Sequence, residues 1–323
     1  MPTTVLPAAS NFMQQLDHGI SVIDTGFVRE RFDASYLIVA NGRGAFVDTG
    51  TNHTVPRLLA ALRAHELEPD SVDWVIVTHV HLDHAGGAGL LLQHLPRAKL
   101  VVHPRGARHM IDPSVLMKGV RAVYGDEVTA RDYGDLVPVP ADRVLTTSDN
   151  YVLELGGRAL RFADTPGHAL HHHCVWDESS KGWFTGDTCG IAYPDLVTPR
   201  GAHMIPATAP VQFDPDALHA SVARLLAAQP RLLYLTHFGA VGEADKLARQ
   251  MLAQIDAMVV AALALAAAPQ RHTRLKQAFE EIYVAELRRC GSLDSDDRLH
   301  SMLETDIELN AQGVGAWLDR RKG

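Results

Sequence analysis

Hydrophobic and polar positions along the first part of the chain predict short strands alternating with helices. The stretches Ile20–Thr25, Ala34–Ala40 and Val72–Val77 are rich in β-branched and aromatic residues and are bounded by turn residues, which is typical of strands. Between them, Asn52–His65 carries apolar side chains at helical spacing. Lys99–Val102 is a further predicted strand, and an irregular insertion follows it.

The middle of the chain repeats this scheme. Tyr151–Leu155 and Ala159–Ala163 flank two glycines, which predicts a β-hairpin. Asp214 precedes a helix expected to end near Ala228, since aspartate is a favoured N-cap residue. Leu232–Leu235 is then another strand. Two β-rich halves, each with helices, indicate the α/β class.

Strand signals vanish after Gly242. Helices are predicted at Glu243–Ala268, Arg271–Arg289 and roughly Leu299–Asp319. We therefore divide the chain into an α/β domain, residues 1–242, and a helical C-terminal extension, residues 243–323. The apolar run Met258–Ala268 is shorter than a membrane span requires, so no membrane association is expected.

Composition adds four expectations. The chain has 323 residues, of which 46% are hydrophobic and 21% charged, as in globular proteins. A net charge of −8 argues against a nucleic-acid partner, because neutralising phosphates requires a basic surface. Three cysteines are too few for a disulfide framework, which favours a reducing compartment. The N-terminus has neither the basic nor the apolar region of a secretory signal, so we expect a cytoplasmic protein.

Histidine is abundant, with 18 residues, and residues 78–87 read THVHLDHAGG directly after a predicted buried strand. Side chains two positions apart in an extended segment point to the same side, so His79 and His81 can chelate one ion. Asp83 and His84, beyond a bend, can reach a second ion. Imidazole and carboxylate are ligands that zinc, iron and manganese accept.

Further motifs extend this pattern: TPGH at 165–168, FTGD at 184–187 and LTH at 235–237. In their order and spacing, residues 18–240 resemble the metallo-β-lactamase-fold hydrolases, including glyoxalase II-like thioesterases and lactonases. The resemblance implies an αββα sandwich, in which two mixed β-sheets pack face to face with helices outside. It also implies a metal centre at the edge where the strand ends meet.

Carried over by motif, the resemblance implies two divalent metal ions, most simply Zn²⁺, with iron or manganese as alternatives. It assigns His79, His81 and His168 to the first ion, and Asp83, His84 and His237 to the second. Asp187 is implied to bridge the two ions. Asp83 is also implied to act in catalysis by orienting the hydroxide that bridges the ions.

The activity implied is attack of this hydroxide on an ester, thioester or lactone of a small molecule. A mononuclear iron oxidoreductase similar to persulfide dioxygenases and a phosphodiesterase are the alternatives. The sequence after Asp187 departs from the glyoxalase II pattern, and no glutathione-binding pattern aligns with the C-terminal helices. These helices are expected to wall the substrate pocket, and their apolar stripe makes a homodimer plausible.

Several neighbouring residues receive other roles. We expect Asp48 to support the ligands from behind, as in the resembled family, and His172 to be structural. His171 and His173 flank His172 and are not expected to be ligands. Cys189, two residues after the bridging aspartate, is expected to pack or to line the pocket.

Four loop residues have open roles. Tyr193 is a candidate donor to a substrate oxygen. His103, His109 and His203 are expected to be surface or pocket-wall residues and not ligands.

Overall fold

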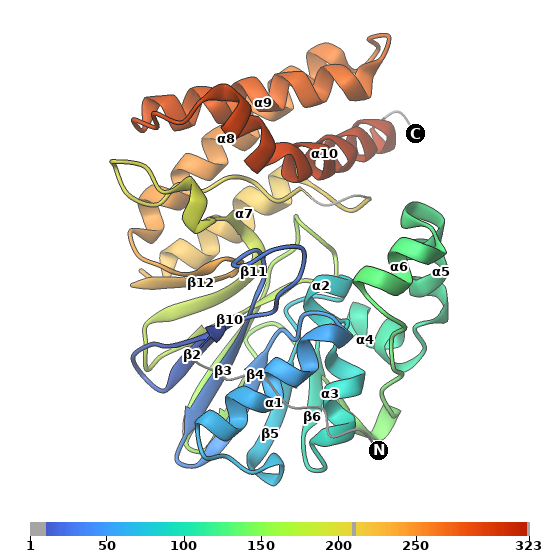
Figure 1. Cartoon of the computed structure of the whole chain (residues 1–323), viewed down its shortest axis with the longest axis vertical. Coiled ribbons are helices and arrows are strands. Elements are labelled where there is room, and N and C mark those ends of the chain that lie inside the picture. Colours follow the sequence, from blue (N-terminus) through green and yellow to red (C-terminus); the bar gives the residue numbers. More distant parts are fainter. Residues whose placement is uncertain (1–10, 209–210, 322–323) are drawn as a thin grey trace.

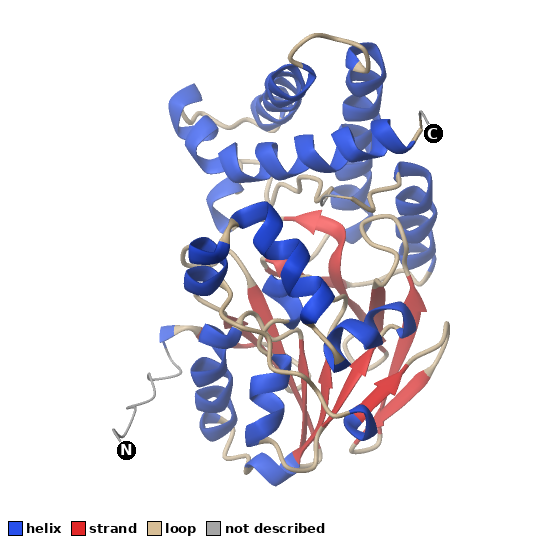
Figure 2. Cartoon of the chain, turned by 90° about the vertical axis from the view of Figure 1, so that its right-hand side faces the viewer, coloured by secondary structure: helices blue, strands red, loops and turns tan. Residues whose placement is uncertain are grey.

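Two mixed β-sheets lie face to face, with helices on both outer sides (Figures 1 and 2). This computed structural model describes residues 11–208 and 211–321, so the first ten residues of the N-terminus discussed above lie outside the described residues. The arrangement confirms the predicted αββα sandwich and its C-terminal helical region.

The first sheet has seven strands in sequence order. Neighbours are antiparallel from β1 to β4 and parallel from β4 to β7. The strands are β1 (Met13–Gln15), β2 (Ile20–Asp24), β3 (Ala34–Ala40), β4 (Arg43–Val47), β5 (Val72–Ile76), β6 (Lys99–Val102) and β7 (Val144–Thr146).

The second sheet has six strands in the order β13-β12-β11-β10-β9-β8. Only the pair β11 and β12 is parallel among these described strands. The strands are β8 (Val152–Leu155), β9 (Arg158–Asp164), β10 (His173–Asp177), β11 (Gly182–Ile191), β12 (Leu232–His237) and β13 (Gly239–Val241).

The α-helices form an outer layer on each sheet and a group at one end of the molecule (Figure 1). They are α1 (Val55–Ala64), α2 (Leu82–Ala85), α3 (Ala88–His94), α4 (Pro104–Ile111), α5 (Ser114–Tyr124), α6 (Asp126–Asp132), α7 (Pro215–Ala227), α8 (Ala244–Leu265), α9 (Arg271–Arg289) and α10 (Asp296–Arg320).

Alternation along the strands produces the layers. On β3, Tyr36 and Ile38 point into the space between the sheets, where Phe162 and Phe184 of the second sheet meet them. Leu37, between them in sequence, points to the opposite face and packs with the helices outside the first sheet. Successive side chains on a strand face opposite sides, so one strand serves two apolar interfaces.

The C-terminal helices share a core with the second sheet. Met251 and Ile255 of α8 belong to one buried cluster with Leu233 and Leu235 of β12. By length and composition alone, α8 is apolar enough to cross a membrane, with a mean hydropathy of 1.3, and 39% of that window is buried inside the protein. Core helices meet the same criteria. The domain boundary at residue 242 stays a prediction.

The insertion between β6 and β7 consists largely of helices, whereas the sequence predicts an irregular insertion with helical stretches broken at glycine and aspartate. It contains α4, α5 and α6. Met117 of α5 packs with Leu82 of α2 and with Leu136 in a small separate cluster. The insertion is therefore fixed over the end of the sandwich at which β5 terminates.

Asn310 attaches α10 to the rest of the protein. Its side-chain oxygen accepts hydrogen bonds from the backbone N–H of Thr208 at 2.6 Å and from the Thr208 hydroxyl at 2.9 Å. Its amide group donates to the carbonyl of Pro206 at 2.9 Å and to the hydroxyl of Tyr283 at 2.7 Å. All of these groups are buried, so the amide couples α10, α9 and the loop before residue 209.

Replacing Asn310 with alanine should lower the free energy of unfolding by about 2–4 kcal/mol, because each buried polar group left unpaired costs roughly 1–3 kcal/mol. Urea unfolding measures this change. Ser301→Ala, at an exposed position of α10, is the control and should stay within about 0.5 kcal/mol of the wild type. Equal stability of the two variants would contradict the anchoring role.

Candidate metal centre

Strand ends bring the predicted ligands to one place. His79 and His81 lie on the loop that follows β5, and Asp83 and His84 lie on the single turn of α2. His168 follows β9. The two remaining residues are on strands: Asp187 within β11 and His237 at the end of β12.

The seven side chains form two groups in which the potential ligand atoms lie within 4.8 Å of one another. The first group consists of His79, His81, His168 and Asp187, and the second of Asp83, His84 and His237. The same seven side chains make up the sets implied by the resemblance, except that the resemblance treats Asp187 as shared by both sets.

Asp187 lies between the groups. Its Oδ2 is 3.3 Å from Nε2 of His168, in the first group. Its Oδ1 is 3.3 Å from Nε2 of His84 and 3.6 Å from Nε2 of His237, in the second group. One carboxylate thus presents a different oxygen to each group, as a bridging ligand does.

At two positions of the motifs, neighbouring atoms lie so close to the backbone that glycine is required. Gly186 has φ +47°, and a Cβ there would lie 2.5 Å from Nε2 of His172 and 2.6 Å from the Thr78 hydroxyl. Gly167 has φ +133°, and a Cβ there would lie 2.4 Å from the backbone of Leu218. Glycine tolerates both the backbone conformation and the lack of space. These contacts explain the glycines of TGD and TPGH.

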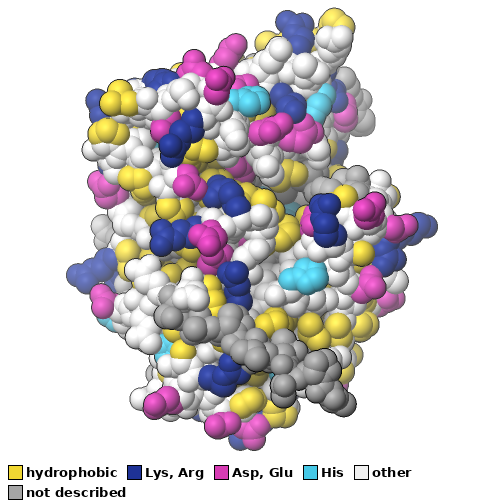
Figure 3. Space-filling model, in the orientation of Figure 1, with side chains coloured by type: hydrophobic (Ala, Val, Ile, Leu, Met, Phe, Trp, Pro, Cys, Tyr) yellow, Lys and Arg dark blue, Asp and Glu magenta, His cyan; other side chains and the backbone are white. Residues whose placement is uncertain are grey.

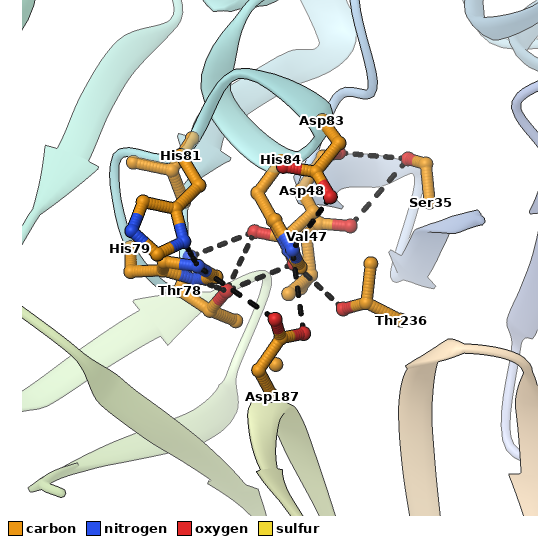
Figure 4. A network of polar contacts seen from close by, with 12 residues as sticks. Ser35, Val47, Asp48, Thr78, His79, His81, Asp83, His84, Asp187 and Thr236 are labelled. Carbon is orange, nitrogen blue, oxygen red and sulfur yellow. Dashed lines mark hydrogen bonds and ion pairs between the residues drawn. The ribbon is translucent and has the colours of Figure 1, made fainter. Parts of the chain in front are cut away.

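Asp48 lies behind the cluster at the centre of a buried network (Figure 4). Its carboxylate accepts hydrogen bonds from the backbone N–H of Thr78 at 2.7 Å and from the Thr236 hydroxyl at 2.8 Å. Its Oδ2 is 3.0 Å from Nδ1 of His84. A carboxylate on the far nitrogen of an imidazole fixes the tautomer and orientation of the ring, which confirms the supporting position predicted for Asp48.

Two other imidazoles are held in the same way by backbone carbonyls. Nδ1 of His168 is 2.9 Å from the carbonyl oxygen of Ala207. Nδ1 of His237 is 2.9 Å from that of Phe32. Each ring therefore directs Nε2 toward Asp187.

The two groups differ in electrostatics. Burial lowers the pKa values of His79, His81 and His168, so these rings are neutral and offer lone pairs. Burial opposes charge on His84 and His237 as well, but neighbouring carboxylates, Asp187 above all, raise both pKa values, that of His237 to about 10. The carboxylates around the second group therefore favour a positive charge at that position.

The donor set fits divalent cations. Nε2 of His84 and Oδ1 of Asp187 are buried without a hydrogen-bond partner among the described residues, although they face each other. Imidazole nitrogen and carboxylate oxygen are the ligand types of zinc, iron and manganese. A cation between them would supply the missing partner and the positive charge.

The structural role expected for His172 and the packing expected for Cys189 are confirmed, and His173 is also held by hydrogen bonds. The ring of His172 contacts the Thr165 hydroxyl at 2.9 Å and accepts from the backbone N–H of Asp187. His173 lies between the Thr147 hydroxyl and the carbonyl of Val77, at 2.9 Å from each. Cys189 is buried in the core of the second sheet.

Other predicted residues are distributed differently. His109 lines the cavity beside the cluster, as expected for a wall residue, and His171 lines it as well. His103 caps α4 and contacts Asp164 at 3.2 Å. The expectation for His203 is wrong: it is fully buried against Gln250 of α8, at 3.0 Å, because the C-terminal helices cover its loop.

A cavity of about 650 Å³ opens beside the cluster. Asp83, His168 and Asp187 lie on one side of it, and α5 and α10 contribute other walls. Of the three C-terminal helices, α10 lines the cavity; that it walls a substrate pocket stays a prediction. Tyr193 also lines it, but its hydroxyl donates a hydrogen bond to Asp306 of α10 at 3.3 Å.

Asp306 and Asn310 were not among the residues singled out from the sequence. A usable signal exists, because both fall at helical spacing among the buried Leu303, Ile307 and Ala311. Two polar residues inside the apolar stripe of a helix indicate a special role for that face.

The comparisons with known proteins agree with this geometry. Residues 28–237 match the sequence profile of the metallo-beta-lactamase superfamily. The chain belongs to this superfamily. The matched region runs from the loop before β3 to the end of β12 and contains all seven predicted ligands.

Two curated relatives illustrate the range of the superfamily. The chain is 31% identical over 176 residues to the metallo-beta-lactamase fold-containing protein ST1585 of Sulfurisphaera tokodaii, covering 53% of this chain and 62% of the relative. It is 27% identical over 154 residues to the thioesterase pkgB of Emericella nidulans, covering 47% and 34%. The chain thus spans less than two thirds of either relative.

Structural similarity extends over more of the chain. The crystal structure of ST1585 superimposes with a TM-score of 0.65 at 23% identity, covering 93% of this chain and 99% of that one. At this identity the similarity supports the fold alone. The fold shared with ST1585 therefore extends beyond the region matched by the sequence profile.

Replacing Asp48 with asparagine should weaken zinc binding by about 10–100-fold, because the charge behind His84 is lost. Asparagine tolerates the positive φ of +55° at this position, so the backbone should be retained. Competition with a chromophoric chelator measures the affinity, and Asp17→Asn, an exposed position, is the matched control. Zinc affinity within twofold of wild type in Asp48→Asn would refute the role.

Proposed function

We propose that this protein is a metal-dependent hydrolase that cleaves an ester, thioester or lactone of a small molecule. The observation that carries the proposal is the Asp187 carboxylate, which presents one oxygen to each of two ligand groups beside a cavity. Membership in the superfamily and the thioesterase relative support it.

The proposed first metal site is His79, His81 and His168, and the second is Asp83, His84 and His237, with Asp187 shared. Divalent ions bound there, which we propose to be two Zn²⁺, would polarise a carbonyl and lower the pKa of water toward neutrality.

Asp83 is the residue proposed to orient the nucleophilic water. It lines the cavity and its Oδ2 lies 3.5 Å from Nε2 of His237 and 3.6 Å from Nε2 of His84. Burial opposes ionisation of Asp83, but these two imidazoles hold the pKa of the carboxyl group below its usual range. The ionised carboxylate can accept a hydrogen bond from the water and so orient its oxygen toward the substrate.

The cavity walls favour an apolar acyl group. Val115, Leu116 and Val120 of α5 and Leu309 of α10 line it. Arg108 is the only lysine or arginine among the described lining residues. A thioester with an apolar acyl chain therefore fits better than a strongly anionic thiol conjugate.

The proposed substrate is a small molecule, and we propose a cytoplasmic protein without a nucleic-acid partner. On the face shown in Figure 3, basic and acidic side chains of the described residues alternate, without a basic region that would follow a phosphate backbone. All three cysteines are free and buried. A homodimer stays a prediction.

Replacing Asp187 with alanine should remove bound metal and lower kcat/KM at least about 100-fold, since even partners behind ligands matter roughly 10–100-fold. Metal content by mass spectrometry and turnover of S-phenyl hexanoate are measured together. Asp142→Ala, at an exposed position, is the control. An Asp187→Ala protein that retains two metal ions and full turnover would defeat the ligand assignment.

A substrate panel separates the candidate reactions. With zinc restored after chelation, the wild type should hydrolyse S-phenyl hexanoate or a medium-ring lactone faster than bis(p-nitrophenyl) phosphate. Preference for the phosphate diester would support the phosphodiesterase alternative. One iron per chain and no hydrolysis in the panel would support the oxidoreductase.

A further inference from the structure

We propose that Asp306 of α10 is a specificity-determining residue that binds a cationic nitrogen at the end of the substrate remote from the cleaved bond. The proposal rests on the proposed function, because the substrate is taken to be a hydrolysable acyl compound. It adds the class of acyl group: one that carries an ammonium or a comparable N–H donor.

The first observation is an unpaired buried oxygen. Asp306 is 4% exposed and lines the same cavity as the cluster. Oδ1 accepts the hydrogen bond from Tyr193, whereas Oδ2 has no hydrogen-bond partner among the described residues. A buried carboxylate needs a charged or hydrogen-bonding partner, because desolvation without one is costly.

Asn310, one turn further along α10, shows that this face can satisfy its polar groups when the role is structural. Asn310 also lines the cavity, yet its oxygen and its amide group are both hydrogen-bonded within the protein. The two residues have similar shapes and burial. They differ in that one carboxylate oxygen of Asp306, Oδ2, has no hydrogen-bond partner among the described residues.

Arg29, which lies beside Tyr193, is bound to other groups. Its guanidinium lies 4.6 Å from the ring centroid of Tyr193 and donates to Asp195 at 2.9 Å. It therefore fixes the tyrosine from outside while Tyr193 holds Oδ1 of Asp306. The aspartate is positioned, and its charge is not directly paired.

The charge state of Asp306 favours a cation over a neutral donor. Burial raises the pKa of Asp306 to about 6, although His237, Tyr193 and Arg29 oppose this effect. The carboxyl group is then mostly ionised at neutral pH. An acyl chain ending in a carboxylate would be repelled, and one ending in a methyl group would leave the charge unpaired.

The test compares S-phenyl 6-aminohexanoate with S-phenyl hexanoate, after subtraction of spontaneous breakdown. A primary ammonium has a pKa of about 10.4 and is charged at neutral pH. The wild type should show the higher kcat/KM for the aminoacyl ester. In Asp306→Asn, the ratio of the two kcat/KM values should fall tenfold or more.

Two variants control for structure. Glu304→Gln removes an exposed carboxylate from the same helix and should keep the wild-type ratio. Tyr193→Phe removes the hydrogen bond to Asp306 but keeps its charge, and should retain the preference for the ammonium. A wild type without preference, or an Asp306→Asn variant with the wild-type ratio, would overturn the proposal.

A binding measurement separates this proposal from the proposed function, and its first comparison uses the wild-type protein alone. By titration calorimetry, hexylammonium should bind the wild-type protein at least tenfold more tightly than 1-hexanol, and Asp306→Asn should abolish the difference. If neither thioester is hydrolysed but hexylammonium binds in this way, the hydrolase assignment fails and the cation site stands. Equal binding of the two ligands to the wild type would refute the cation site.

Discussion

The contact between the Asp187 carboxylate and the imidazoles around it is the interaction on which the rest of the site depends. Burying the carboxylate or a charged imidazole without the other would be unfavourable, because an isolated buried charge costs free energy. The fold meets this requirement by running β11 beside β12, so that Asp187 and His237 reach the same point. Gly186 leaves room for His172, and Asp48 fixes His84 from behind.

The cavity combines two kinds of structure. Its polar side comes from strand ends held by two packed sheets, whereas its opposite walls come from α5 and α10, which are attached by local clusters and by the amide of Asn310. Rigid sheets keep ligand atoms in place, and helices outside them can present different side chains to a substrate. Under the proposed function, the strand ends would hold the reacting groups, and the helices would supply the side chains that select the substrate.

The sequence predicted most of the layers because strand alternation and helix periodicity are local. The motif residues were predicted as a set because TPGH, FTGD and LTH, together with THVHLDHAGG, resemble the motifs of a known family in order and spacing. Three-residue strands such as β1 and β7 were missed, since three residues carry no periodic signal. The burial of His203 and the position of Asp306 were not predicted, because the residues that contact them lie far away in the sequence.

Asp306 shows why such a residue is not found by searching the sequence for motifs. Its significance lies in what surrounds it: Tyr193 bonds one carboxylate oxygen, the other oxygen has no partner among the described residues, and Arg29 donates to Asp195. A polar residue within an apolar helical stripe has two explanations, an internal hydrogen-bond network or an external ligand. Asn310 meets the first within the described structure, and Asp306 does not, so the free oxygen of Asp306 points to a ligand that the cavity receives from outside.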